Sequence, residues 1–122
     1  MCKNDSLISR GDLYWALLSD VDTSKSADDN VQKGRRPVVV VQNNAGNIYS
    51  QTVIVAPITS RHKKMLPVHV AVTKEETGLP LDSVVLLEQI TTINKNQLSD
   101  FIGKVNLNTM QRIDKAIEIS IL

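Results

Sequence analysis

The sequence predicts a small α+β domain in which a strongly bent antiparallel sheet of five to seven strands forms a barrel-like structure closed by one C-terminal helix. Two observations predict it. Most apolar segments are β-branched runs separated by turn residues, and only the last segment changes to a helical period. The chain has 122 residues, 42% apolar and 22% charged, which is the size and balance of one domain spanning residues 1–122.

Several segments have the composition of β-strands. The runs at 37–42 and 52–56 are unbroken and apolar, which indicates strands buried on both faces. Segments 13–17 and 68–72 have five residues each, and the second alternates as a half-buried strand does. Segment 83–93 is long enough for one strand or two. Asn and Gly in residues 43–50 predict a turn that joins the two unbroken runs into a hairpin.

The C-terminal segment predicts an amphipathic helix. Apolar residues recur there at three- and four-residue steps, from Leu107 through Met110 and Ile113, and Asn106 or Asn108 is a suitable N-cap. A short helical turn is expected at 94–98. Residues 19–34 are polar, with isolated apolar residues, and are expected to form a long loop that serves as a lid or a partner-binding flap.

Composition excludes several classes of protein. The lone cysteine, Cys2, permits no intrachain disulfide, and the sequence has neither a signal peptide nor an apolar segment of about 20 residues, so we expect a cytoplasmic protein. Aromatic residues make up 3% of the chain, which argues against a sheet covered with stacking rings for single-stranded nucleic acid. Gly-rich phosphate loops and paired zinc ligands are absent, and no metal or cofactor is expected.

The net charge of +1 conceals an uneven distribution along the chain. Residues 1–29 carry three basic and six acidic side chains, and residues 75–122 carry four and seven. Residues 30–74 carry seven basic side chains, no carboxylate and both histidines. The central segment is therefore a candidate site for a polyanion.

Two basic clusters flank the predicted hairpin. Lys33, Arg35 and Arg36 precede the first strand, and Arg61, Lys63 and Lys64 follow the second, after Thr59. If the two strands are antiparallel neighbours, both clusters meet at one end of the sheet. Arginine's planar fork of donors matches phosphate, so we expect a phosphate site there. The alternative is a solvated, charged edge that prevents aggregation.

Groups for proton transfer are harder to assign. His62 lies in the basic segment and is either a bystander or a phosphate contact. His69 lies within an alternating strand, which favours a structural role. Arg36 is a poor base because of its high pKa, so an electrostatic role suits it better.

Five blocks of the sequence resemble a known family. They are residues 10–15 (RGDLYW), 34–43 (GRRPVVVVQN), 52–60 (TVIVAPITS), 66–70 (LPVHV) and 82–90 (DSVVLLEQI), followed by Thr92 and Ile93. In this order, they resemble the MazF/PemK toxins of bacterial toxin-antitoxin systems. The Arg-Pro strand and the Ala-Pro-Ile-Thr-Ser segment are the two signature blocks.

The resemblance implies an SH3-like barrel of the PemK-like fold and a homodimer that cleaves single-stranded mRNA at specific sequences. It implies cleavage without a metal, to 2′,3′-cyclic phosphate and 5′-hydroxyl ends, and inhibition by a cognate, MazE-like antitoxin with an acidic, flexible C-terminal tail. The family's catalytic arginine and threonine correspond to Arg36 and Thr59. Expected RNA-binding residues are Asn43, Ser60, Arg61, Lys64, Leu66 and Gln89.

Three features depart from the family pattern. The loop before Gly34 is longer, and Asn30, Val31 and Gln32 stand where a carboxylate is usual; Thr91 replaces a usual basic residue. An alternative function is a non-enzymatic toxin that inhibits a topoisomerase, as the fold-related gyrase toxin CcdB does. Another is a nuclease that has lost its activity. For a dimer interface, apolar residues of 83–93 are the candidates.

Overall fold

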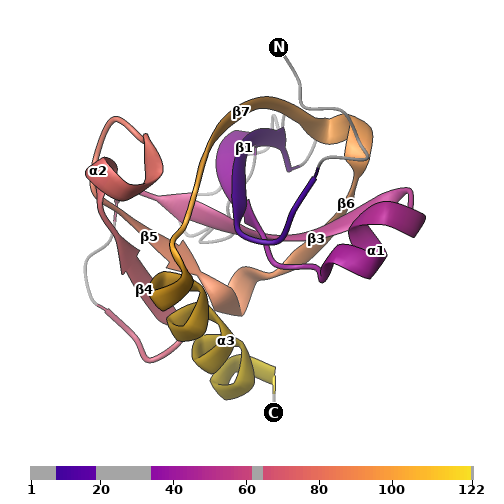
Figure 1. The fold of residues 1–122 in the computed structure, drawn as a ribbon. Coiled ribbons are helices and arrows are strands. Elements are labelled where there is room, and N and C mark those ends of the chain that lie inside the picture. The colour runs from indigo at the N-terminus through magenta and orange to yellow at the C-terminus, as the bar shows by residue number, and fades with distance from the viewer. Residues whose placement is uncertain (1–7, 19–33, 62–64, 122) are drawn as a thin grey trace, which may run out of the picture.

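The computed structural model describes residues 8–18, 34–61 and 65–121. Its elements, shown in Figure 1, are strands, helices and two short 3₁₀ helices (η). In chain order they are β1 (Asp12–Leu17), β2 (Arg35–Val40), α1 (Asn44–Tyr49), β3 (Thr52–Thr59), β4 (His69–Val72), α2 (Lys74–Thr77), β5 (Ser83–Leu86), η2 (Leu87–Gln89), β6 (Thr91–Asn94), η3 (Lys95–Gln97), β7 (Leu98–Lys104) and α3 (Leu107–Ile121).

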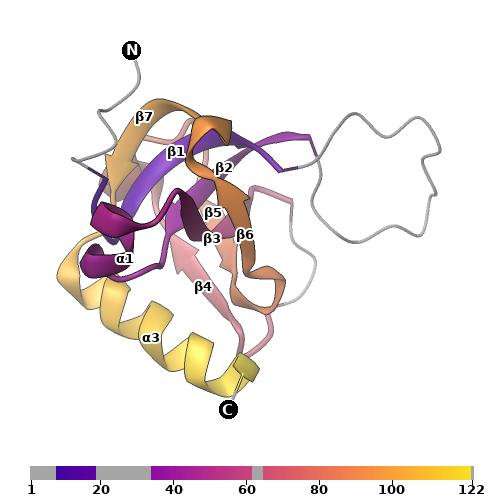
Figure 2. The ribbon, with the colours of Figure 1, turned by 90° about the vertical axis from the view of Figure 1, so that its right-hand side faces the viewer.

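The seven strands form one antiparallel sheet. Its order is β4-β5-β3-β2-β1-β7, and β6 pairs with β3. The terminal strands β4 and β7 are not paired with each other in the described part of the chain, so the barrel predicted from the sequence is an open, bent sheet. α3 crosses one side of it near β4 (Figure 2).

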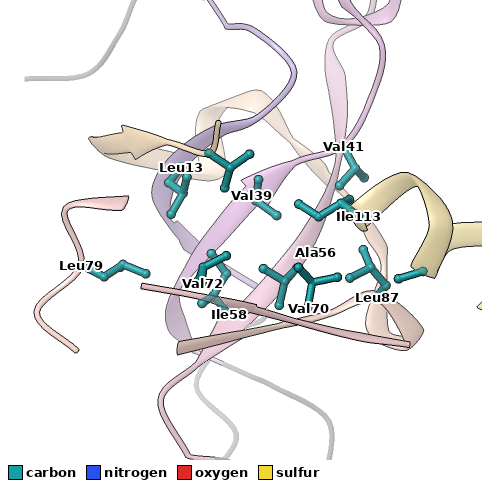
Figure 3. Packing of buried hydrophobic residues seen from close by; sticks show 13 residues of the cluster. Leu13, Val39, Val41, Ala56, Ile58, Val70, Val72, Leu79, Leu87 and Ile113 are labelled. Carbon is teal, nitrogen blue, oxygen red and sulfur yellow. The ribbon is translucent and has the colours of Figure 1, made fainter. Parts of the chain in front are cut away.

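β2 and β3 are buried on both faces, as their unbroken apolar runs predict. Val39 and Val41 contribute to one apolar cluster, which includes Ala56, Ile58 and, from α3, Ile113 (Figure 3). On the opposite face, a second cluster contains the alternate residues of the same strands: Val38, Val40, Val53 and Val55, together with Tyr14 and Ala16 of β1. Alternation along each strand therefore divides the core into two layers.

The segment predicted as a turn at 43–50 contains a short helix instead. Asn43 is the N-cap of α1, and its side chain accepts a hydrogen bond of 2.9 Å from the N–H of Gly46. Asn47 is buried; its Oδ1 accepts a hydrogen bond of 3.2 Å from Gln42 Nε2, and its Nδ2 donates one of 3.0 Å to the Gln42 backbone oxygen. The cap and this buried network stabilise a helix that its Asn and Gly content disfavours.

Segment 83–93 divides into β5 and β6, joined by η2. The predicted interface there is wrong, because Val84, Val85, Leu86, Leu87 and Ile93 are each at most 5% exposed and pack in the core of their own chain. The predicted helical turn at 94–98 is η3. Asn106, one of the two suggested caps, accepts a hydrogen bond of 2.8 Å from the Thr109 N–H at the start of α3.

The sequence pattern gives no sign of β7. This strand pairs with β1 through register shifts on either side of Tyr14, so its apolar residues do not alternate regularly. α2 lies close against β7: a Cβ on Gly103 would be 2.2 Å from the backbone oxygen of Thr77. The close approach of α2 to β7 requires glycine at this position, and it places the following residues, 79–83, beside the ends of β2 and β3.

A Gly103→Ala substitution should lower the free energy of unfolding by about 3 kcal/mol, because the added methyl meets a backbone carbonyl that cannot rotate away. The measurement is denaturant unfolding. As a control, Gly34 has φ +75° and no atom within 4 Å of a built Cβ. Gly34→Ala should therefore lose only the cost of a left-handed backbone, about 1 kcal/mol. Equal losses in the two variants would contradict this account of the contact.

Candidate functional site

The start of β2 and the end of β3 lie side by side at one end of the sheet. β2 begins there with Arg35 and Arg36, and β3 ends there with Thr59. The two strands are antiparallel, with Val38 opposite Pro57, so the same register extended by two residues sets Arg36 opposite Thr59. The expected convergence of the basic clusters is therefore confirmed for the residues that the structure describes.

Arg35 and Arg36 leave β2 on opposite faces. Arg36 is on the face of Val38 and Val40, together with Thr59, whereas Arg35 is on the face of Val39, together with Pro37. On the neighbouring strand, Trp15 is paired with Pro37 and shares the face of Arg35. The end of the sheet thus presents a different arginine on each side.

A pocket of about 250 Å³ opens at this end of the sheet. Residues from β1, β2, the end of β3 and the segment after α2 line it: Trp15, Arg35, Arg36, Pro37, Ile58, Thr59, Ser60, Arg61, Leu79, Pro80, Leu81 and Ser83. The lining includes three arginines and no carboxylate. Such a site favours an anion, and its apolar wall offers contact area for a flat or apolar group.

Thr59 is the last residue of β3, and its side chain forms hydrogen bonds with the backbone that follows. Its Oγ1 accepts a hydrogen bond of 3.0 Å from the Arg61 N–H and donates one of 3.3 Å to the Arg61 backbone oxygen. These two bonds hold the hydroxyl in a local turn, and residues 59–61 of that turn line the pocket. The longer, weaker bond leaves the proton available for exchange to a stronger acceptor, such as a phosphate oxygen.

Part of the pocket lining comes from the segment after α2. Leu79 is buried, and its N–H donates to Thr77 Oγ1 at 3.1 Å. Leu81 is 57% exposed, and its backbone oxygen accepts a hydrogen bond of 2.9 Å from Ser83 Oγ. These contacts fix the wall against β5. Sequence reasoning missed this part of the lining, because nothing in the local pattern of residues 79–83 indicates proximity to β2. It also missed Trp15, because a low aromatic content does not show where a single ring lies.

Ser60 and Arg61 line the pocket with Arg36 and Thr59. The other residues expected to bind RNA that the structure describes lie outside this pocket. Asn43 caps α1 at the opposite end of β2, and α1 and α2 are on opposite sides of the molecule in Figure 1. Gln89 ends η2, beyond β5. Lys64 lies outside the described residues, as do Lys33, His62, Lys63, Cys2 and the loop at 19–33.

His69 has the structural role that its place in an alternating strand predicts, because it holds Leu66. The Leu66 N–H donates to His69 Nδ1 at 3.1 Å, and His69 Nε2 is 3.0 Å from Glu88 Oε2. Because Nδ1 accepts, the ring proton is on Nε2 and is donated to Glu88. His69 is opposite Leu86 at the far end of β5 from Thr59, so it is not part of the pocket.

Within residues 8–18, 34–61 and 65–121, no three His, Cys, Asp or Glu side chains are grouped so that they could hold a metal ion. In the same residues, no helix is long and apolar enough to cross a membrane.

Comparison with known proteins identifies relatives over almost the whole chain. The family of PemK-like, MazF-like toxins of type II toxin-antitoxin systems matches residues 9–121. The Endoribonuclease MazF of Staphylococcus saprophyticus is 45% identical over 116 residues, which are 94% of this chain and 92% of that protein.

Solved structures agree with this assignment. An endoribonuclease in complex with its cognate antitoxin from Mycobacterial species has a TM-score of 0.73 at 26% identity, covering 93% of both chains. MazF from Deinococcus radiodurans, at 20% identity, has a TM-score of 0.71 over 92% of this chain and 94% of its own, and shows the common fold. The PemK-like fold expected from the sequence is confirmed. This chain belongs to the PemK-like, MazF-like toxins of type II toxin-antitoxin systems.

Proposed function

We propose that this toxin is a sequence-specific endoribonuclease that cuts single-stranded RNA without a metal ion and leaves 2′,3′-cyclic phosphate and 5′-hydroxyl ends. The observation that carries the proposal is the meeting of Arg36 and Thr59 across β2 and β3, beside Ser60 and Arg61. The staphylococcal relative's name, endoribonuclease, favours a nuclease over a topoisomerase inhibitor.

In the proposed reaction the nucleophile belongs to the RNA. The 2′-oxygen bonds to the adjacent phosphorus, and the bond from phosphorus to the 5′-oxygen of the next nucleotide breaks. The proton lost by the 2′-hydroxyl is balanced by one gained at the leaving 5′-oxygen. The protein must stabilise negative charge on the five-coordinate phosphorus group, which fixed cationic donors do well in a site shielded from water.

Arg36 is proposed to stabilise this negative charge. Its guanidinium can donate two parallel hydrogen bonds to non-bridging phosphate oxygens, which orients the phosphate as well as stabilising it. Thr59 is assigned one further hydrogen bond, from Oγ1 to a phosphate oxygen, in place of its 3.3 Å contact with the Arg61 backbone oxygen. The Arg61 N–H keeps Thr59 oriented throughout, because it donates to the same hydroxyl oxygen at 3.0 Å.

The RNA strand is proposed to run beyond the pocket. Ser60 and Arg61 contact it next to the scissile phosphate, and Lys64, Leu66, Gln89 and Asn43 are proposed contacts farther away. A groove that reaches Asn43 and Leu66 is longer than the pocket of one chain, which favours a homodimer with a shared groove. Exposed apolar residues suited to the twofold interface lie outside 83–93, among them Ile48, Phe101 and Ile119.

We also propose a protein partner, an antitoxin of the MazE kind whose acidic, flexible tail covers the same groove. The central segment 30–74, with seven basic residues and no acidic ones, is the electrostatic complement of such a tail. The mycobacterial relative was solved with its cognate antitoxin.

Arg36→Ala should reduce kcat by roughly 100- to 1000-fold, the loss typical of one charge-stabilising donor. Arg36→Lys should recover part of this, because it restores charge without the planar fork. Thr59→Ser should retain activity and Thr59→Val should lose it, since only serine keeps the hydroxyl. The measurement is single-turnover cleavage of a defined RNA, with circular dichroism to check folding. Full activity in folded Arg36→Ala would reject the assignment.

His69→Gln should lower stability by about 1–2 kcal/mol, because the Leu66 N–H and the Glu88 carboxylate lose their shared partner. Its kcat should remain near that of the wild type, since His69 lies outside the pocket. Urea unfolding and cleavage at saturating RNA measure the two effects. A loss of kcat as large as that of Arg36→Ala would instead make His69 the proton-transfer group.

Cleavage should continue undiminished in EDTA, because arginine side chains supply the positive charge. A single 2′-deoxy substitution at the nucleotide before the cut should abolish cleavage there, since it removes the nucleophile. End mapping of a long defined RNA, with tests for cyclic phosphate and 5′-hydroxyl, measures both results. A requirement for Mg²⁺, or cutting at the 2′-deoxy position, would reject the proposed chemistry.

A further inference from the structure

Arg35 is held in a fixed orientation at the mouth of the pocket. Its guanidinium carbon lies 4.6 Å from the centre of the Trp15 ring, and its Nη2 is 3.4 Å from Asp100 Oδ2. Both charged side chains are more than half exposed, at 53% and 60%. An exposed ion pair of this length adds little stability by itself. Its effect here is to keep a planar cation beside an indole ring.

Three strands build this arrangement. Trp15 is opposite Pro37 across the β1–β2 ladder, so Arg35 is its diagonal neighbour on the same face. Asp100 comes from β7, on the other side of β1. Ser99, the residue before it, donates from Oγ to the Trp15 backbone oxygen at 3.1 Å. The register of the sheet therefore positions all three side chains.

Leu79, Pro80 and the 57%-exposed Leu81 also line this pocket. The lining therefore combines an indole, a planar cation and aliphatic side chains. A volume of about 250 Å³ suits one flat ring system and is below the range of about 300–1,000 Å³ usual for drug-sized ligands. Nucleobases bind in such sites by stacking on aromatic rings and guanidinium planes.

We infer that this pocket binds the base of one nucleotide next to the scissile phosphate, between the Trp15–Arg35 pair and the residues at 79–81. The inference rests on the proposed RNA cleavage. The phosphate lies at Arg36 and Thr59 on one face of β2, and the base turns around the strand end to the face of Arg35. Arg35 and Trp15 then determine sequence preference at one position of the RNA.

Trp15 is the only tryptophan in the chain and is a direct probe of this contact. An RNA made uncleavable by a 2′-deoxy substitution should quench its fluorescence on binding. Moving a single abasic site along that RNA should remove the quenching at one position only, next to the blocked bond, while fluorescence polarisation still reports binding. Quenching that no abasic position removes would overturn the inference, whether or not the protein cuts RNA.

Arg35→Lys and Leu81→Ala test the specificity in cleavage. With a library randomised around a cut site, both variants should reduce the preference at one adjacent position by roughly tenfold, the size of one lost stacking contact. Preferences at the other positions should be unchanged. Lys115→Ala and Leu107→Ala are matched controls, because both residues are exposed on α3, at 73% for the Lys115 side chain and 75% for Leu107. They should leave every preference unchanged.

Asp100→Asn separates orientation from charge. Removing a carboxylate should tighten binding to any RNA if only charge matters, with no change in sequence preference. If Asp100 holds Arg35 on Trp15, the same variant should weaken the preference at the position affected by Arg35→Lys. Unchanged preferences in all three variants, with normal cleavage by the wild type, would overturn the inference and leave the proposed nuclease intact.

Discussion

The pairing of β2 with β3 is the constraint on which the rest of the molecule depends. Both strands are buried on both faces, so a one-residue shift of β3 against β2 would move Val55 to the face where Ala56 packs, and Ala56 to the face of Val55. The register that satisfies the core is also the one that sets Arg36 opposite Thr59. Burial of apolar residues thus determines, within one residue, the geometry of two polar residues at the strand ends.

The sequence predicts those helices and strands that can be recognised from their own residues alone. The unbroken runs that form β2 and β3, and the helical period of α3, are of this kind. β7 is not, because its bulged pairing with β1 around Tyr14 destroys the alternation that marks a strand. α1 is a helix because Asn43 caps it and buried Asn47 bonds to Gln42, although its composition is that of a turn. In each failure a contact between neighbouring segments overrides local preference.

The same distinction explains how much of the site could be anticipated. Arg36, Thr59, Ser60 and Arg61 are at the ends of predictable strands, so one assumption about pairing brings them together. The wall at Leu79–Leu81 depends on α2 lying against Gly103, a contact that residues 79–83 do not reveal. Trp15 was underestimated for a different reason: a low aromatic content says nothing about where a single ring is placed.

In the proposed function, the two adjacent arginines give one end of the sheet a role in both affinity and specificity. Phosphate contacts position a nucleic acid without reading its sequence, and base contacts supply the sequence information. Strand alternation separates Arg36 from Arg35, and Asp100 offsets the charge of Arg35 while Trp15 orients its plane. In the proposed site, Arg35 therefore contributes less as a charge than as a flat surface. A net charge of +1 for the chain is compatible with the proposed anion site, because the acidic residues lie outside the segment 30–74 and one of them, Asp100, pairs with Arg35.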